Sequence, residues 1–506
     1  MSERGTKSYF ELLLPPKRET RLKPCTAYGG TLCGLRGGGA ACLDTADRAF
    51  TQGSICLLLP AIGTISSLPN TAVLMHGAIG CGSSMHASTA SMRSGSLVRR
   101  GAAVDSLWFS TAMNESDVIS GGEQKLERAL VEIDGRYAPR TIVVVSGCVP
   151  GVTGDDVEGV IARVQPSLSA RVLPVHCEGF RTKIWATAYD AYYHAFGRYL
   201  FEAPPGAPPP DQARAQRTVN LLNVSSMGRV DELELERLLK LLDLEVNVFP
   251  VFADPERMYE VTRAGLSIST CPTHDDYLLT HLEERYGIPS VLRHMPIGIG
   301  NTGSWLRDVA ARVGREAQAR EIVAREEAEL RFALERFRPV LEGKTVLVSA
   351  GEYRALATAT LLSELGLRIL AVRTFHHDEF AETEYETLAA RAGADLTLNV
   401  ANCQPFEEAN LIRRLKPDVF LGHYAGNATA SKLGVATHTI YNVGLNYVGY
   451  KGAYELAGRL YRQLKNPAFN RRLAAHAALP YRKGWYASEP FAYIRNQGEA
   501  EGAGRT

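Results

Sequence analysis

Short apolar runs that lead into glycine-containing turns and then into helical stretches restrict the fold of this chain most strongly. Examples are "TAVLMHGAIGCG", "TIVVVSGC" and "GKTVLVSAGEYRALATATLLSELGLRILAV". Strands that alternate with helices in this way build parallel sheets covered by helices on both faces. The length of 506 residues exceeds one core, since domains of roughly 150 residues are typical. We therefore predict an α/β fold of three doubly wound parallel-sheet domains.

Shifts in composition place the domain boundaries. A Gly- and Cys-rich stretch that includes "YGGTLCGLRGGGAAC" predicts an irregular N-terminal arm over residues 1–50. The Pro-rich stretch "FEAPPGAPPPDQARAQ" indicates a linker or surface loop. We predict a first α/β domain over 51–215, a second over 216–335, and a third with a C-terminal tail over 336–506.

Charge and hydropathy exclude two classes of function. The 56 basic residues balance the 55 acidic ones, which argues against a nucleic-acid-binding surface. We see no apolar run of the ~18 residues that a membrane span needs. The N-terminal stretch "MSERGTKSYFELLLPPKRET" lacks the apolar core of a signal peptide. We therefore expect a cytoplasmic protein without nucleic-acid or membrane partners.

Cysteines follow several of the predicted strands. Cys81, Cys148 and Cys177 each lie where a strand has just ended, Cys56 lies shortly upstream, and Cys271 follows the apolar segment "AGLSIST". Ligands of doubly wound sheets bind beyond the carboxyl ends of the strands. Thiolates there would suit soft metals and iron–sulfur clusters. The alternative is that they are small buried apolar residues, because no compact CxxC spacing occurs.

Several segments match one known family in order and spacing. They are "HGAIGCG", "FSTAMNESDVISGGEQKLERAL", "SGCVPGVTGDDVEGV", "CEGFR", "CPTHDDYLLTHLEERYGIP" and "YNVGLNYVGYKGAYELAGRL". Together they resemble component 1 of the nitrogenase superfamily, on its α-subunit side, over roughly residues 50–470. The resemblance implies a fold of three α/β domains that together hold two metal clusters.

The resemblance assigns the first cluster to the first domain. It implies that Cys56, Cys81 and Cys148 help to hold a P-cluster-like iron–sulfur cluster, shared with a β-type subunit at their interface. Gly80 and Gly82 would let the backbone approach that cluster closely. For the acidic pair that follows, Asp155 and Asp156, we expect capping of the next helix.

The second cluster would be a larger, buried, iron-only iron–sulfur cofactor held by Cys271. In nitrogenases proper, a C-terminal histidine ligates the other end of the cofactor. In the matching stretch, "GVATHTIYNVGLNYVGYKG", that position falls near Thr439, Tyr441 or Asn442, depending on the alignment. The nearest histidine is His438. We predict His438 and Asn442 as neighbours of the cofactor, with a purely structural His438 as the alternative.

The predicted substrate face also departs from nitrogenase. Trp185 and Tyr189 occupy the places of a glutamine and a histidine that line the dinitrogen site in the family. Tyr189 would offer a phenol as a proton or hydrogen-bond donor. Arg354, in "GEYRA", matches a basic residue that leans over the anionic cofactor. The alternatives are a helix that packs its aromatic face into the core and a surface arginine.

These departures argue against dinitrogen reduction. They favour the catalytic α-type subunit of a nitrogenase-like methylthio-alkane reductase, which cleaves C–S bonds of small organic sulfur compounds. The resemblance implies that such a subunit forms an α2β2 complex and receives electrons from a homodimeric ATP-dependent iron protein. The chain itself has no GxxxxGK(S/T) phosphate loop, so the ATP step would belong to that partner.

Other functions stay open at this point. They are a non-catalytic scaffold for assembly of a nitrogenase-type cofactor, a dinitrogen-reducing α subunit, and a tetrapyrrole reductase, against which the Cys271 segment argues. The roles of Cys25, Cys33 and Cys42 in the arm are not predicted, and a structural role is expected for Cys177 and Cys403.

Overall fold

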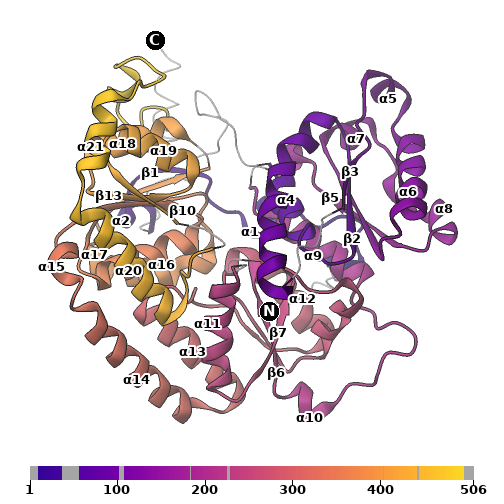
Figure 1. Cartoon of the computed structure of the whole chain (residues 1–506), viewed down its shortest axis with the longest axis horizontal. Coiled ribbons are helices and arrows are strands. Elements are labelled where there is room, and N and C mark those ends of the chain that lie inside the picture. The colour runs from indigo at the N-terminus through magenta and orange to yellow at the C-terminus, as the bar shows by residue number, and fades with distance from the viewer. Residues whose placement is uncertain are drawn as a thin grey trace, which may run out of the picture.

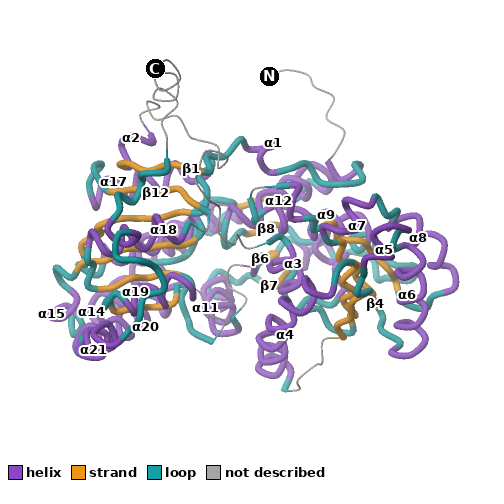
Figure 2. The backbone as a smooth tube through the Cα atoms, turned by 90° about the horizontal axis from the view of Figure 1, so that it is seen from above, coloured by secondary structure: helices purple, strands orange, loops and turns teal. Residues whose placement is uncertain are grey.

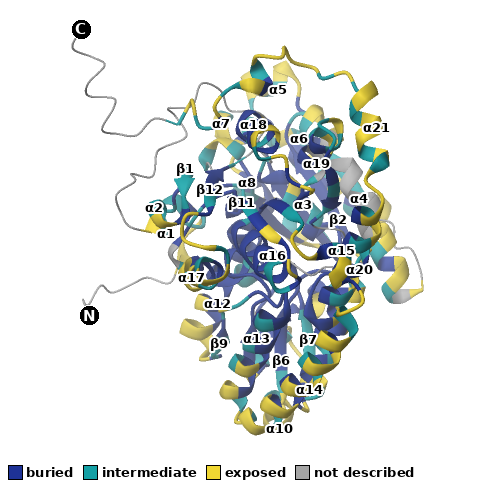
Figure 3. Ribbon diagram, turned by 90° about the vertical axis from the view of Figure 1, so that its left-hand side faces the viewer, coloured by how far each residue is buried: buried dark blue, intermediate teal, exposed yellow. Residues whose placement is uncertain are grey.

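Three parallel sheets, each covered by helices, organise the chain (Figure 1). The computed structural model describes residues 9–36, 56–101, 107–182, 184–224, 228–402, 404–440 and 444–494. In this part of the chain the predicted α/β architecture is confirmed, and buried side chains fill the interior (Figure 3). None of the described helices is long and apolar enough to span a bilayer.

The first sheet has the strand order β3-β2-β4-β5, and all its neighbours are parallel. Strands β2 and β4 are buried at every position, as expected for strands with helices on both faces. The strands are β2 (Thr71–His76), β3 (Leu107–Ser110), β4 (Thr141–Ser146) and β5 (Arg171–His176). The helices are α3 (Leu58–Ile65), α4 (Ile79–Arg100), α5 (Glu115–Ser120), α6 (Glu123–Tyr137), α7 (Cys148–Thr153), α8 (Val157–Val164), η3 (Gln165–Ser167), η4 (Gly179–Arg181) and α9 (Thr187–Tyr199).

The second sheet repeats this topology with the order β7-β6-β8-β9. Its strands are β6 (Thr218–Leu222), β7 (Glu245–Phe249), β8 (Leu266–Ile268) and β9 (Ser290–Val291). Its helices are α10 (Gln212–Ala215), α11 (Arg229–Lys240), η6 (Pro255–Arg263), α12 (Pro272–Tyr286), α13 (Ile299–Val313) and α14 (Glu316–Leu334). In both sheets the strand order reverses between the first strand and the third, which is where doubly wound sheets bind ligands.

The third sheet has the order β1-β12-β11-β10-β13-β14, and only β1 is antiparallel. Its parallel strands are β10 (Thr345–Ala350), β11 (Arg368–Thr374), β12 (Thr397–Ala401), β13 (Val419–Gly422) and β14 (Ala436–Thr439). The helices are α15 (Arg338–Leu341), α16 (Glu352–Glu364), η7 (Glu379–Ala381), α17 (Glu382–Ala392), α18 (Pro405–Leu415), α19 (Tyr424–Lys432), α20 (Gly449–Lys465), α21 (Ala468–His476) and η8 (Trp485–Ala487). The domain boundaries proposed from composition stay predictions.

The N-terminal arm, predicted to be irregular, contains regular structure in its described part. Its elements are η1 (Tyr9–Glu11), α1 (Arg18–Leu22), β1 (Ala27–Thr31) and α2 (Leu32–Arg36). Strand β1 pairs antiparallel with β12, from Ala27 opposite Ala401 to Thr31 opposite Thr397. The two glycines of "AYGGT" weaken the local strand signal. Only a partner far along the chain makes this segment a strand.

A buried network of charges fastens this arm to the first two sheets. Arg18 donates to Asp190 of α9 at 3.1 Å and to Asp276 of α12 at 2.9 Å. Arg21 also pairs with both aspartates. The Arg18 side chain is fully buried. Helix α1 therefore clamps α9 against α12, beside which it lies in Figure 2.

Replacing Arg18 with methionine removes half of this network. Because Asp190 and Asp276 then lose a buried partner, we expect the free energy of unfolding to fall by roughly 3–5 kcal/mol. The measurement is the urea midpoint. Arg36→Met is the control, because the carboxylate partners of Arg36 are exposed, and such pairs contribute at most about 1 kcal/mol. Equal midpoint shifts in the two variants would contradict the expectation.

Candidate functional site

Three cysteine thiols converge at the carboxyl edge of the first sheet. Cys81 lies in the first turn of α4 after β2, Cys148 begins α7 after β4, and Cys56 precedes α3. The backbone N–H of Gly179 donates to Sγ of Cys148 at 3.2 Å. A Cβ atom added to Gly179 would lie 3.0 Å from Sγ of Cys56 and 3.6 Å from Sγ of Cys148. Gly179 therefore lies against both thiols, where a side chain would crowd them.

The electrostatics of these thiols suit a bound metal cluster. Burial raises the pKa of the Cys56 thiol, and the nearby Cys148 and Cys81 thiols raise it further. Neighbouring thiols become thiolates together only when a cation offsets their charge. Thiolate sets select soft metals, including the iron of iron–sulfur clusters. The residues present therefore fit the predicted cluster.

Exposed apolar side chains border each turn of this thiol site. Ile79, Val152 and Phe180 are exposed to 57%, 75% and 58%. They lie beside the turns that carry Cys81, Cys148 and Gly179 respectively. The thiols themselves are only partly buried. Large apolar groups gathered on a surface are typical of sites that another protein covers.

A charged group holds the turn that carries Gly179. Nε2 of His176 lies 2.7 Å from Oε1 of Glu158, and Nδ1 lies 3.0 Å from Oε1 of Glu178. Burial by itself lowers the pKa of His176, but the two carboxylates outweigh it and raise the pKa to about 9. His176 therefore stays positively charged near neutral pH.

The glycines that the sequence singled out behave differently from each other. A Cβ atom on Gly80 would meet nothing within 4 Å, whereas one on Gly82 would lie 2.5 Å from the Trp108 ring. Gly82 thus makes room for an indole. The close approach to thiols occurs at Gly179, which sequence reasoning missed although "CEGFR" contains it.

Asp155 and Asp156, which precede α8, have different partners. Asp156 caps α8 by accepting from the backbone N–H of Gly159 at 2.9 Å, which confirms the capping prediction for this residue. For Asp155 the prediction is wrong. Its Oδ2 lies 3.0 Å from Nε2 of His76 and accepts from the N–H of Gly122 at 3.0 Å. The fold places a buried histidine within reach of Asp155, and a local helix signal cannot show that.

A second buried site surrounds Cys271, which precedes α12 as its N-cap residue and is 4% exposed. Asp275 fixes the turn, because its Oδ2 accepts from Oγ of Ser269 at 2.8 Å and from the N–H of Cys271 at 3.4 Å. Burial is the main cause that raises the pKa of Asp275 to about 7. Tyr353 of α16 is close enough to Cys271 to interact electrostatically with it.

Aromatic rings from all three sheet regions meet near Cys271. The Tyr189 ring of α9 lies 4.1 Å from the His274 ring of α12. Trp185 lies 5.7 Å from Tyr189 and 6.0 Å from Phe375, which follows β11. Phe375 in turn lies 5.4 Å from His423, which follows β13. The structure thus brings the predicted Trp185 and Tyr189 together with three rings that were not predicted.

Arg354 is buried in this region, so its reading as a surface residue is wrong. It is 8% exposed and donates to the carbonyl of Ile440 at 3.4 Å. Burial first, and Arg354 second, lower the pKa of His274 well below its usual value and that of His423 to about 4. The site therefore combines a thiol, neutral imidazoles and the buried Arg354 beside a helix N-terminus. That set suits an anionic iron–sulfur cofactor.

At the predicted second end of the cofactor site, the structure describes His438 but not Asn442. His438 on β14 is buried, and burial together with Arg459 lowers its pKa to about 4. Its Nε2 has no hydrogen-bond partner within the described ranges. Its proximity to a cofactor stays a prediction. Asn442 lies outside the described residues.

Of the remaining cysteines, the structure describes Cys25, Cys33 and Cys177, and we assign none of them as a ligand of either site. Cys177 is buried and unbridged, and Cys33 is exposed and unbridged. Cys25 is disulfide-bonded. Cys42 and Cys403 lie outside the described residues.

Comparison with known proteins identifies the family. The family model "Nitrogenase component 1 type Oxidoreductase" matches residues 56–465. A solved structure titled "Nitrogenase Cp1 at pH 5" superimposes with a TM-score of 0.70 at 21% identity, covering 91% of this chain and 98% of that chain. That likeness supports the fold alone. Because the family model spans most of the chain, the chain belongs to the nitrogenase component 1 type oxidoreductases.

Curated relatives fall into two groups. The nitrogenase iron-molybdenum cofactor biosynthesis protein NifE of Nostoc sp. is 27% identical over 436 residues, which cover 84% of this chain and 86% of the relative. The nitrogenase molybdenum-iron protein alpha chain of Leptolyngbya boryana is 24% identical over 415 residues, which cover 78% of this chain and 81% of the relative. The first group is named for cofactor biosynthesis and the second for the nitrogenase itself.

His176 predicts a pH dependence of stability. Its folded pKa of about 9 exceeds the ordinary value of 6.5. The stabilisation is therefore complete below the ordinary pKa and disappears as the pH rises through the folded value. We expect the thermal midpoint of the wild type to fall over that interval more than the midpoint of His176→Gln does. Parallel curves for the two proteins would contradict the assignment.

Proposed function

We propose that this chain is the α-type subunit of a component 1 complex, and that it serves as a scaffold on which a nitrogenase-type cofactor is held and passed on. The observation that carries the proposal is the buried Cys271 site, in which His274 follows the thiol on α12 and Arg354 interacts electrostatically with His274 and His423. Relatives named for iron-molybdenum cofactor biosynthesis, which match along most of their length, support the scaffold role.

At the first site, Cys56, Cys81 and Cys148 would supply thiolates to an iron–sulfur cluster shared with a β-type subunit. The partial exposure of the thiols supports a shared site, because a second chain has room to add ligands. The exposed side chains of Ile79 and Phe180 support a partner surface there. A bound cluster would accept and pass on single electrons. An α2β2 assembly follows the family pattern.

At the second site, Cys271 would hold one end of the cofactor. Arg354 would offset the negative charge of the cofactor. Its guanidinium is held in place because it donates to the carbonyl of Ile440 and lies 5.4 Å from the Tyr447 ring. The neutral rings of His274 and His423 would offer nitrogen donors or hydrogen bonds. Trp185 and Tyr189 would keep water out.

A second candidate function is reduction of methylthio-alkanes, and the closed form of the site supports it. Cys271 and Tyr189 are only 4% and 5% exposed, whereas a scaffold has to release its cofactor. In this reading an iron-only cofactor would receive electrons from a homodimeric ATP-dependent iron protein. Cleavage of one C–S bond takes two electrons and two protons and yields a thiol and a hydrocarbon. Tyr189 is the candidate proton donor.

Cys271→Ala tests the second cluster. Because Cys271 is the only thiol assigned to that site, we expect the anaerobically purified complex to lose the iron and the EPR signal beyond those of the interface cluster. Cys177→Ala is the matched control, since Cys177 is buried, unbridged and assigned to neither site. Full iron content in Cys271→Ala would contradict the proposal.

Two assays on the same preparation separate the candidate functions. A scaffold should restore activity to a cofactor-free nitrogenase component 1 by giving up its cofactor. A reductase should instead release methane from dimethyl sulfide when an iron protein and MgATP are supplied. Hydrocarbon release without cofactor transfer would replace the scaffold proposal by the second candidate.

Gly179→Ala tests the interface cluster. The added methyl group would crowd the Cys56 and Cys148 thiols, so we expect less iron retained per complex than in the wild type. Gly80→Ala is the control, because the same methyl group there meets nothing within 4 Å. Iron loss in Gly80→Ala alone would show that the cluster approaches the backbone at Gly80 instead.

A further inference from the structure

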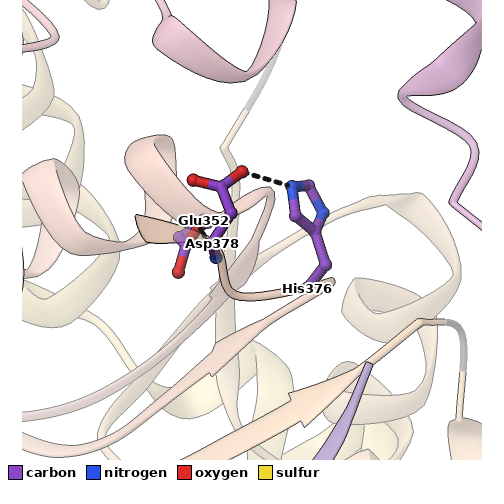
Figure 4. Close-up of side chains that lie close together, drawn as sticks. All are labelled: Glu352, His376 and Asp378. Carbon is purple, nitrogen blue, oxygen red and sulfur yellow. Dashed lines mark hydrogen bonds and ion pairs between the residues drawn. The ribbon is translucent and has the colours of Figure 1, made fainter. Parts of the chain in front are cut away.

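Three buried metal-ligand side chains meet at the carboxyl edge of the third sheet. Strands β10 and β11 are parallel neighbours that end in register, Ala350 opposite Thr374. Glu352 begins α16 directly after β10, while His376 and Asp378 follow β11. One ligand atom from each of the three lies within 4.8 Å of the others. Figure 4 shows their side chains gathered in one place.

His376 is a buried imidazole that the fold does not satisfy. It is 2% exposed, and neither ring nitrogen has a hydrogen-bond partner among the described residues. Its Nε2 lies 3.5 Å from Oδ2 of Asp378, longer than a hydrogen bond of about 2.7–3.2 Å. Oδ2 of Asp378 also has no hydrogen-bond partner in the described ranges. Buried polar atoms are normally paired, so both atoms point to a missing ligand.

Neighbouring groups fix the two carboxylates. Oε1 of Glu352 accepts from the Tyr385 hydroxyl at 3.0 Å and lies 2.8 Å from Nδ1 of His377. Oδ1 of Asp378 accepts from the N–H of Phe380 at 3.2 Å, which leaves Oδ2 toward His376. Outer partners of this kind orient the ligands of metal sites.

The arginine nearest this cluster is already engaged. Arg18 interacts electrostatically with Asp378, but its guanidinium donates to Asp190 at 3.1 Å and to Asp276 at 2.9 Å. It therefore leaves Oδ2 of Asp378 without a hydrogen bond, and the 3.5 Å ion pair with His376 (dashed in Figure 4) is its remaining interaction among the described residues. A small cation between Glu352, His376 and Asp378 would satisfy what Arg18 does not.

We propose that Glu352, His376 and Asp378 bind a single divalent first-row transition ion, separate from both clusters. Nitrogen and oxygen ligands without a thiol suit Mn²⁺, Fe²⁺ or Zn²⁺. Metal–ligand bonds of about 2.0–2.2 Å place ligand atoms about 3–4 Å apart, and the Nε2–Oδ2 distance of 3.5 Å falls in that range.

The ion would stabilise one wall of the Cys271 site. Glu352 lies on the same turn of α16 as Tyr353 and Arg354, and His376 follows Phe375, whose ring packs against Trp185. By binding Glu352, His376 and Asp378 together, the ion would connect the turn between β10 and α16 to the segment that follows β11. No thiol takes part, so this inference stands apart from the proposed cluster function.

Mn²⁺ binding to the full chain, produced without iron–sulfur assembly and freed of metal, tests the inference. Mn²⁺ avoids thiols, and its pulsed EPR spectrum reports a coordinated imidazole nitrogen. We expect one Mn²⁺ per chain with ¹⁴N coupling and a raised thermal midpoint. His376→Gln should lose the coupling, and Asp378→Asn should raise the Kd at least ~10-fold.

Matched variants make the outcome decisive. His281→Gln is the control, because His281 is also buried and both of its ring nitrogens lack hydrogen-bond partners among the described residues, yet it packs on Phe10 with ring centroids 3.6 Å apart. It should keep the coupling. Cys271→Ala, prepared in the same metal-free way, should also keep the coupling. This result does not depend on how much iron the anaerobically purified Cys271→Ala complex retains. Absence of bound Mn²⁺ in the wild type, or unchanged ¹⁴N coupling in His376→Gln, would overturn the proposal.

Discussion

The buried pairing of Arg18 and Arg21 with Asp190 and Asp276 is the interaction on which the Cys271 site depends. Asp190 follows Tyr189 on α9, and Asp276 lies on α12, the helix that Cys271 precedes. Two positive and two negative charges cancel inside the protein, and each aspartate meets both arginines. Buried charges tolerate little displacement, because an unpaired one is costly. The clamp therefore sets how closely the two helices approach.

The two cluster sites differ in what they leave to other molecules. The Cys56, Cys81 and Cys148 thiols are partly exposed beside apolar side chains, which supports the proposal that a partner chain completes that site. The Cys271 site is enclosed, and its histidines are held neutral mainly by burial. In such a low-dielectric space Arg354 would act strongly on an anionic ligand. This contrast supports the proposed shared cluster at the first site and the proposed cofactor at the second.

Sequence reasoning placed the cysteines at strand ends, because that placement follows from short local patterns. The roles of Trp185 and Tyr189, which came from the family resemblance, stay predictions. Cys81 and Cys148 lie beyond adjacent parallel strands because an apolar run followed by a turn ends at the same sheet edge each time. The failures share one cause, since each depends on a distant partner. Strand β1 needs β12, Asp155 needs His76, and Gly179 lies against the Cys56 and Cys148 thiols. The burial of Arg354 likewise involves Ile440 and Tyr447, which are distant in the sequence.

The sequence alone determined the alternation of strands and helices, the three-domain α/β class and the cysteines at strand ends, because side-chain periodicity and turn residues act locally. Tertiary structure decided which of those ends meet. It joined Trp185 and Tyr189 to Phe375 and His423 from the third sheet, and it brought Glu352 to His376. The physical reason is that contacts between distant segments arise only when whole sheets pack and exclude water, and no local pattern encodes that packing.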